Sequence, residues 1–524
     1  MVSKIGSVYR INNRQIEIVH NRDIFSSPKS DGKGLHIVGL MNSYVSIPLF
    51  NASTAIGIIF EQIEPSKENE ILFSPKSEIV ISKIRLIGIY DSIKEDFKKG
   101  IDFFPTLNSD VFSIDSKMLS AIYGTVLKKS NVQLQIGTDI YLDNVIINAD
   151  PNILFGKHCA VFGNTGSGKS CTIASVLQGV YLDRKSRLNN TTKKRLKTII
   201  IDSNEEYAKV FDDAASLTDG NTITPDWVSV QSFEDLELSH KDLNFHELTE
   251  LLKEDSLNVI PYLRQAICTL KNTDNVDDKT YYEFATLAEQ VVKEVPKIKD
   301  IKGNVMDDVF TMGYLKHVVR RIKNFSEDDR LTSIFGKEHN SIMNFLSDSK
   351  KSVLILSLRV SNDILSLLSY MICKSIFSFK SNVGIDHKEN ILLVLEEAHR
   401  YISSNSTGMI NNYYVDKLAR EGRKYGVNLL VSTQRPSEVS QTVISQCNSL
   451  IVHKISNARD LEFIRNTIEY DDKNQIDLLT SLKQQQALVL GEAFAFSSLV
   501  RIADANPLPR SETPTIFTAD LDTT

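Results

Sequence analysis

The run Gly163-Asn-Thr-Gly166-Ser-Gly168-Lys169-Ser170 constrains the fold more than any other part of this sequence. It matches G-x-x-x-x-G-K-[ST] at every fixed position, a pattern whose glycines let backbone N–H groups turn inward around phosphate oxygens. The run follows an apolar segment, Cys159–Phe162, and opens a helical one, so these N–H groups would lie at a helix N-terminus. The order strand, loop, helix predicts a phosphate-binding loop (P-loop) in an α/β domain.

The P-loop also predicts the ligand. In such loops the lysine reaches the β- and γ-phosphates and the hydroxyl that follows it binds Mg²⁺, so we expect Lys169 and Ser170 to act on Mg-ATP. ATP and Mg²⁺ are the expected cofactors. The expected nucleotide-binding residues are Gly163, Asn164, Thr165, Gly166, Ser167, Gly168, Lys169, Ser170 and Cys171.

The chain after Pro151 alternates continuous apolar runs with helical segments. Buried strands separated by helices indicate a mostly parallel sheet covered on both faces. Between about Ser239 and Ser349 we see amphipathic helical stretches, such as Phe245–Leu252 and Tyr281–Val295, and no strong strand signal. The predicted strands are Cys159–Phe162, Thr198–Ile201, Val353–Leu356, Ile391–Leu395, Leu429–Ser432 and Leu450–His453.

The first part of the chain has a different pattern. Short β-rich runs such as Ala55–Ile63 and Glu78–Tyr90 are separated by turn residues, which favours a small β-barrel over the alternative of an irregular β-rich cap. We therefore expect a barrel domain in residues 1–150 and a P-loop ATPase core in residues 151–505. A helical insertion would occupy 238–349 of that core, and 506–524 would form a C-terminal tail.

An acidic pair ends one predicted strand. In Ile391-Leu-Leu-Val-Leu-Glu396-Glu397, an apolar run is followed by two carboxylates, the arrangement that places one acid near the metal and one near the attacking water. We expect Glu396 to hold Mg²⁺ through its water shell and Glu397 to be the catalytic base.

Two other strand ends carry polar residues. Asp202 follows Thr198–Ile201, and Gln434 follows Leu429–Ser432. Ligands of open α/β sheets bind beyond the carboxyl ends of the strands, so both are candidate site residues. Each alone is also typical of an ordinary turn.

The charge of the chain bears on whether it binds nucleic acid. The chain has 60 basic and 66 acidic side chains, a net charge of −6, which does not suggest a protein coated in nucleic acid but permits a local basic lining. The most basic stretch, Asp183–Lys197, fits a solvated loop or a phosphate contact, and the polar loop Ser403–Asn412 fits a channel lining or filler.

The sequence also favours a cytoplasmic protein. Its five cysteines form no C-x-x-C pair, which fits a reducing compartment, and the N-terminus lacks the apolar core of a signal peptide. The apolar stretch Ile364–Ile376 is interrupted by Ser366, Ser369 and Lys374, so we expect no membrane span.

Together these motifs resemble the HerA branch of the HerA–FtsK ATPases. The resemblance covers nearly the whole chain and rests on the P-loop, on Asp202 with Glu206-Tyr207, on Glu396-Glu397-Ala-His399, on Ala419-Arg420-Glu-Gly-Arg423-Lys-Tyr-Gly426 and on Ser432-Thr-Gln-Arg-Pro-Ser-Glu438. It implies a RecA/FtsK-like sheet after a small barrel of the family's own type. It also implies a homohexameric ring that translocates double-stranded DNA.

The same resemblance implies roles and partners. Lys169, Asp202, Glu397 and Gln434 match the family's hydrolytic positions, and Arg420 and Arg423 match arginines that face a neighbouring subunit's nucleotide. Family members work with a NurA-like nuclease, a sirtuin-type enzyme or another nuclease, in DNA end processing or antiphage defence. This sequence departs from the pattern with Glu396 in place of Asp and with Asn204-Glu205 where His-Gly is common.

Alternatives stay open at this point. A hexameric scaffold that activates an effector without moving along DNA needs the same site, and a conjugation- or secretion-type pump ATPase shares the motifs. The segment Arg420–Lys424 is also typical of a charged helix end that stops at Gly426.

Overall fold

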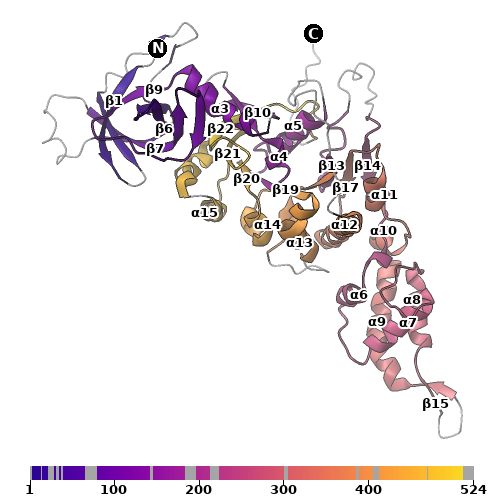
Figure 1. Cartoon of the computed structure of the whole chain (residues 1–524). Coiled ribbons are helices and arrows are strands. Elements are labelled where there is room, and N and C mark those ends of the chain that lie inside the picture. Colours follow the sequence, from indigo (N-terminus) through magenta and orange to yellow (C-terminus); the bar gives the residue numbers. More distant parts are fainter. Residues whose placement is uncertain are drawn as a thin grey trace, which may run out of the picture. The chain divides into compact units, whose positions relative to one another are not determined.

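A closed barrel forms the N-terminal part of the computed structural model (Figure 1). Its strands hydrogen-bond in the order β2-β1-β9-β5-β6-β7, and pairing between β7 and β2 closes the ring, while β8 extends it from β7. Apolar, mostly β-branched side chains alternate inward and form one buried core, which includes Ile18, Val45 and Ile59. The strands are β1 (Lys4–Ile11), β2 (Ile16–Asn21), β5 (Tyr44–Pro48), β6 (Ser53–Ile63), β7 (Ile79–Asp91), β8 (Asp96–Lys99) and β9 (Asp110–Ser113).

The structure describes most of the chain, and it divides into two compact units. The first consists of Met1–Thr192 and Asn448–Ala505, and the second of Lys193–Cys447 and Asn506–Thr524. The residues described are 3–12, 15–21, 29–30, 35–36, 39, 41–64, 79–130, 132–141, 145–182, 196–212, 224–299, 305–384, 389–404, 412–468 and 470–510.

The first unit continues after the barrel with helix α3 (Ser116–Ser130) and a six-strand run in the order β11-β10-β22-β21-β20-β12. β12 and β20 are parallel, and the others pair antiparallel. β10 precedes residue 150 but bonds with β22, so the barrel strands end earlier than the expected boundary. The elements are β10 (Leu134–Asp139), β11 (Ile146–Ala149), α4 (Pro151–Leu154), β12 (Cys159–Phe162), α5 (Lys169–Tyr181), β20 (Ser449–Val452), α15 (Ala458–Thr467), η8 (Tyr470–Ser481), β21 (Gln486–Gly491) and β22 (Ser498–Ile502).

The second unit contains five parallel strands in the order β19-β18-β13-β17-β14. β13, β17, β18 and β19 are almost completely buried, as expected for strands covered by helices on both faces. The strands are β13 (Leu196–Asp202), β14 (Val228–Ser232), β17 (Val353–Ser357), β18 (Asn390–Leu395) and β19 (Val427–Thr433). The α/β P-loop fold with an N-terminal barrel is therefore confirmed.

One helix of this unit, α12 (Asn362–Val383), is longer than the apolar stretch expected from the sequence. By length and composition it could cross a membrane, but 72% of its most apolar window is buried inside the protein. The remaining elements of the core are η5 (Ala398–Arg400), α13 (Tyr413–Glu421), η6 (Gly422–Tyr425), η7 (Pro436–Glu438) and α14 (Gln441–Ser445).

The expected insertion is helical, with one small addition. Two of its helices match the amphipathic stretches foreseen, and a two-stranded hairpin, β15 with β16, was not foreseen because each strand has three residues, all exposed. The elements are η3 (His240–Asp242), α6 (Phe245–Leu251), α7 (Ile260–Lys271), α8 (Phe284–Lys293), β15 (Lys297–Lys299), β16 (Val305–Asp307), α9 (Val309–Glu327), η4 (Asp329–Leu331), α10 (Thr332–Phe335) and α11 (Ser341–Ser347).

Candidate functional site: a P-loop and an acidic strand edge

The P-loop joins β12 to α5 in the first unit. Gly168, immediately before α5, has a left-handed backbone with φ +111°, which would strain any residue with a side chain. A Cβ on Gly163 would lie 2.5 Å from Ser167 Oγ and 2.6 Å from His453 Cβ. The geometry of the loop itself therefore requires these two glycines, as the motif predicts.

Lys169 lies within the curve of this loop. It is 6% exposed, and its Nζ donates to the Asn164 carbonyl at 3.3 Å. The same carbonyl accepts the Ser167 N–H at 3.2 Å and the Ser167 hydroxyl at 2.7 Å. The long bond to Lys169 is one that a phosphate oxygen can replace with a stronger, charge-assisted bond. Ser170 and Cys171, which follow on α5, are half-buried.

A buried histidine supports the loop from beneath, and the sequence analysis did not single it out. His453 follows β20; its N–H donates to the Phe162 carbonyl at 2.8 Å, and its ring lies between the Thr172 hydroxyl at 2.8 Å and the Gln486 carbonyl at 3.0 Å. Burial, and secondarily the charge of Lys169, lower the pKa of His453 to about 4, against the raising effect of its bond to Gln486. The ring is therefore neutral, with Nδ1–H donating to Gln486 and Nε2 accepting from Thr172.

The predicted acidic residues lie along one edge of the second unit's sheet. Ile201 pairs with Leu395, and Leu395 pairs with Val431, so β13, β18 and β19 end side by side. Because parallel strands end in the same direction, the residues after these pairs share that edge. The structure therefore brings together Asp202, Glu396, Glu397 and Gln434.

Glu397 is held in an unusual backbone conformation. Its φ of +46° is left-handed, which is uncommon for a residue other than glycine and is often found at functional sites. Its Oε2 lies 3.3 Å from His399 Nδ1, and the same nitrogen lies 3.1 Å from Thr433 Oγ1 at the end of β19. Thr433 Oγ1 also accepts the Arg435 N–H at 3.0 Å. A chain of contacts therefore runs from Glu397 to the residues on both sides of Gln434.

Glu396 and Asp202 are more deeply buried. Glu396 is 2% exposed and Asp202 is fully buried. Asp202 accepts the Glu206 N–H at 3.0 Å and the Tyr207 N–H at 2.8 Å. Burial raises the pKa of Asp202, and these backbone bonds partly counteract the rise. Asp202 therefore fixes the backbone of the loop that follows β13. In this loop Glu205 has φ +63°, a left-handed conformation that a glycine would adopt without strain.

The two candidate arginines lie on the surface of the second unit. Arg420 is near the end of α13 and Arg423 lies in η6, and both side chains are exposed. Gly426, with φ +70°, ends this segment. Asp416, one turn before Arg420, has a pKa raised by burial and partly restored by its bond from Ser440 and by the charge of Arg420. Both arginines therefore face outward from the segment formed by α13 and η6.

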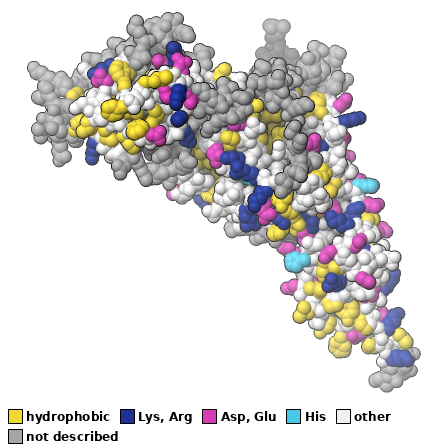
Figure 2. All heavy atoms as spheres, in the orientation of Figure 1, with side chains coloured by type: hydrophobic (Ala, Val, Ile, Leu, Met, Phe, Trp, Pro, Cys, Tyr) yellow, Lys and Arg dark blue, Asp and Glu magenta, His cyan; other side chains and the backbone are white. Residues whose placement is uncertain are grey.

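Two stretches were considered as contacts for DNA, each beside an alternative without DNA, and most of their residues are not described. Residues 183–195 and 405–411 lie outside the described part of the chain. Lys197, the last residue of the basic stretch, is buried in β13 and donates to the carbonyls of Phe345, Leu346 and Asp348 at 3.0, 3.0 and 2.6 Å. It caps the end of α11, so Lys197 belongs neither to a solvated loop nor to a phosphate contact. Over the insertion, Figure 2 shows basic and acidic side chains interspersed rather than a field of one sign.

These features define the class of the protein. A P-loop between a buried strand and a helix, together with a sheet edge carrying two consecutive carboxylates, is the equipment of a P-loop ATPase. The protein is an ATP-hydrolysing enzyme.

Comparisons with known proteins show which proteins the chain is similar to. A family model described as the central domain of the helicase HerA matches residues 130–376. The chain is 23% identical over 463 residues to "Probable helicase MJ1565" of Methanocaldococcus jannaschii, covering 84% of this chain and 79% of that protein. It is 25% identical over 415 residues to "DNA double-strand break repair helicase HerA" of Saccharolobus solfataricus, covering 76% and 73%. The solved structure of VirB4 of Thermoanaerobacter pseudethanolicus aligns with a TM-score of 0.47 at 16% identity, covering 71% of this chain and 96% of that one. Over most of its length the chain is therefore similar to HerA-type helicases.

Proposed function

We propose that this ATPase works as a homohexameric ring that translocates double-stranded DNA and drives an effector enzyme. The observation that supports a ring-shaped assembly is the exposure of Arg420 and Arg423 on α13 and η6. An arginine supplied from outside the binding loop accelerates phosphoryl transfer by about 10³–10⁵. An arginine facing outward from this segment is suited to a neighbouring subunit's nucleotide, and a closed ring gives every subunit such a neighbour.

The chemistry divides among the residues as follows. Backbone N–H groups of the P-loop and Lys169 bind the ATP phosphates, and Glu397 orients and deprotonates the attacking water. His399 and Thr433 connect Glu397 to the residues on both sides of Gln434, which suits Gln434 to report the state of the γ-phosphate to the rest of the sheet.

The residues present also fit Mg²⁺. This ion keeps several waters and takes only one or two protein ligands beside the phosphates. Ser170 offers a hydroxyl on α5, and Glu396 offers a buried carboxylate after β18. When bound, Mg²⁺ would neutralise charge on the β- and γ-phosphates.

Duplex DNA and an effector complete the proposal. The curated relative of Saccharolobus solfataricus is named as a DNA double-strand break repair helicase, which supports DNA as the substrate. A NurA-like nuclease or a sirtuin-type enzyme is the proposed partner, in DNA end processing or antiphage defence. A motor that follows any sequence must hold its track through phosphates, so its binding should weaken steeply with salt.

Displacement of streptavidin from the biotinylated end of a linear duplex tests the motor. The wild-type ring with ATP should remove the block, duplex should stimulate ATP turnover, and Glu397→Gln should bind the duplex without removing the block. If neither duplex nor single strands change the turnover while the partner's activity still depends on the ring, the translocase is refuted and a scaffold replaces it.

A further inference from the structure

A buried carboxylate lies where the helical insertion joins the ATPase core. Glu247, on α6, is 5% exposed. A reciprocal capping box fixes it: the Asn244 side chain accepts the Glu247 N–H at 2.8 Å, and Glu247 Oε2 accepts the Asn244 N–H at 2.7 Å. The carboxylate therefore has a defined position at the first turn of α6.

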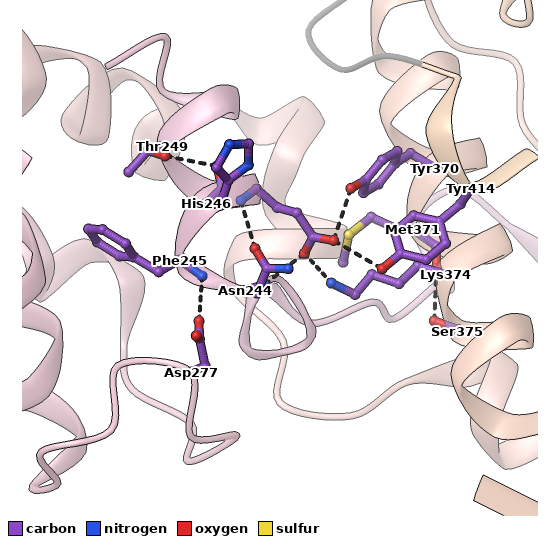
Figure 3. Close-up of polar contacts among 11 residues, drawn as sticks. Asn244, Phe245, His246, Thr249, Asp277, Tyr370, Met371, Lys374, Ser375 and Tyr414 are labelled. Atoms are coloured by element: carbon purple, nitrogen blue, oxygen red, sulfur yellow. Dashed lines mark hydrogen bonds and ion pairs between the residues drawn. The ribbon is translucent and has the colours of Figure 1, made fainter. Parts of the chain in front are cut away.

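Four donors converge on this carboxylate from three elements. Oε1 accepts the hydroxyls of Tyr370, on α12, at 3.0 Å and of Tyr414, on α13, at 3.1 Å. Oε2 accepts the Asn244 N–H and forms an ion pair with Lys374 on α12. Figure 3 shows the side chains of Tyr370, Lys374 and Tyr414 pointing toward one another, and the contacts above place the Glu247 carboxylate between them. A carboxylate has about four acceptor positions, so this one is fully used.

The hydroxyl protons of this cluster are firmly held. Burial, reinforced by the negative charge of Glu247, raises the pKa of both Tyr370 and Tyr414. Lys374 is 8% exposed, and Tyr370 is 6% exposed. A buried ion pair is rarely a source of net stability compared with well-packed apolar side chains, and its better-attested effect is to select one arrangement of the elements that it joins.

One of these elements carries the candidate arginines. Tyr414 is the second residue of α13, and Arg420 lies six residues further, about 9 Å along the helix axis at 1.5 Å per residue. Arg423 follows in η6, which begins where α13 ends. Because Tyr414 and Arg420 share one helix, a displacement at Tyr414 is transmitted to Arg420, and to Arg423 through η6, which continues directly from α13.

The segment formed by α13 and η6 packs against helix α12. The Phe377 ring, on α12, lies 6.2 Å from the Tyr414 ring and 5.6 Å from the Tyr425 ring, so it touches the start of α13 and the end of η6. Lys417 Nζ lies 4.1 Å from the centre of the same ring. These contacts hold α13 and η6 on α12, whereas the Tyr414 hydroxyl links them to the insertion.

We propose that Glu247 is a positioning residue for Arg420 and Arg423, so that the insertion sets the placement of the arginine segment through Tyr414. This inference rests on the role proposed above for these arginines in a neighbour's hydrolysis. The insertion is then a control element for ATP turnover. Its position relative to α12 decides whether the arginines are presented correctly.

A matched pair of substitutions tests the link. Tyr414→Phe removes the bond between Glu247 and α13 but keeps the ring, whereas Tyr370→Phe removes the same kind of bond from α12, which carries no arginine of this segment. In full-length rings, Tyr414→Phe should lower kcat for ATP by about tenfold, because a misplacement of about 1 Å can cost up to about 100-fold. KM for ATP should stay unchanged, since the P-loop is untouched. Tyr370→Phe should keep kcat within about twofold of wild type, with a Tm equal to that of Tyr414→Phe.

A double-mutant cycle separates positioning from a general structural effect. If Tyr414 acts through the arginines, adding Tyr414→Phe to Arg420→Ala/Arg423→Ala should lower kcat by less than about twofold more. A full additional tenfold loss, or equal losses of kcat in Tyr414→Phe and Tyr370→Phe, overturns the inference. If Arg420→Ala/Arg423→Ala itself turns over ATP at the wild-type rate, the proposed role of the arginines fails, which is a different result from additivity.

Discussion

The neutral histidine beneath the P-loop makes a quantitative prediction about pH. His453 is fully buried, and burial lowers its pKa from 6.5 to about 4. Between these values the unfolded chain binds a proton at this position and the folded protein does not, so unfolding becomes easier as the pH falls. At about 1.4 kcal/mol per pH unit, this interval corresponds to about 3 kcal/mol of unfolding free energy. Above pH 6.5 the titration of His453 does not lower the unfolding free energy. As the pH falls from 6.5 toward 4, the unfolding free energy falls by the full amount.

His453→Gln removes the titrating group. The glutamine amide keeps one donor and one acceptor, which can replace the bonds of the ring to Gln486 and Thr172. Urea unfolding followed by circular dichroism, repeated across this pH range, should give a shallower loss of stability for the variant by about 3 kcal/mol. His240, whose pKa burial also lowers to about 4, stays in both proteins and keeps part of the slope.

Equal slopes in wild type and His453→Gln would refute this reasoning. They would mean that His453 is already protonated in the folded protein, or that it is not buried as described. In either case the loop's support beneath Lys169 would need a different explanation.

Three further predictions concern turnover and strain. Glu397→Gln should bind ATP but hydrolyse it about 100-fold more slowly, the scale of losing a general base, and a wild-type rate in a single-turnover assay would contradict the assignment. Lys169→Ala should weaken nucleotide binding, and mixing its subunits with Arg420→Ala or Arg423→Ala subunits should restore some hydrolysis. No recovery in confirmed mixed rings would place the arginines in cis. Glu205→Gly should raise the unfolding free energy by up to about 1 kcal/mol by relieving a left-handed backbone, and a loss of stability on urea unfolding would argue against that strain.

The parts of this protein that are local in sequence could be predicted from it. The strand Cys159–Phe162 has the expected bounds, and the P-loop glycines have the backbone that their motif requires. The apolar runs that became β13, β17, β18 and β19 were each located to within two residues, because a strand buried on both faces has an unmistakable composition. That the ends of these strands share one edge then follows from the parallel sheet.

The parts that depend on distant contacts could not be predicted. His453 is 284 positions from Lys169 along the chain, and nothing in its neighbourhood marks it as a support for the P-loop. Lys197 looked like part of a basic surface stretch, yet three backbone carbonyls at the end of α11 bury its ammonium. A charge pattern describes which side chains are basic. It does not reveal which of them have found partners in the fold.

Glu247 illustrates the same limit with a consequence for function. Its neighbours in sequence, Asn244-Phe-His-Glu247, form a capping box in the structure, and this local motif accounts for Oε2 alone. Oε1 is used by two tyrosines that lie 123 and 167 positions away, on helices of the ATPase core. A helix cap needs no such partners, and a structural spacer needs no buried charge. The Glu247 carboxylate both caps α6 and bonds to Tyr414 on α13, so the orientation of the insertion depends on α13. The small substitution Tyr414→Phe therefore tests whether the insertion controls ATP turnover or only fills space.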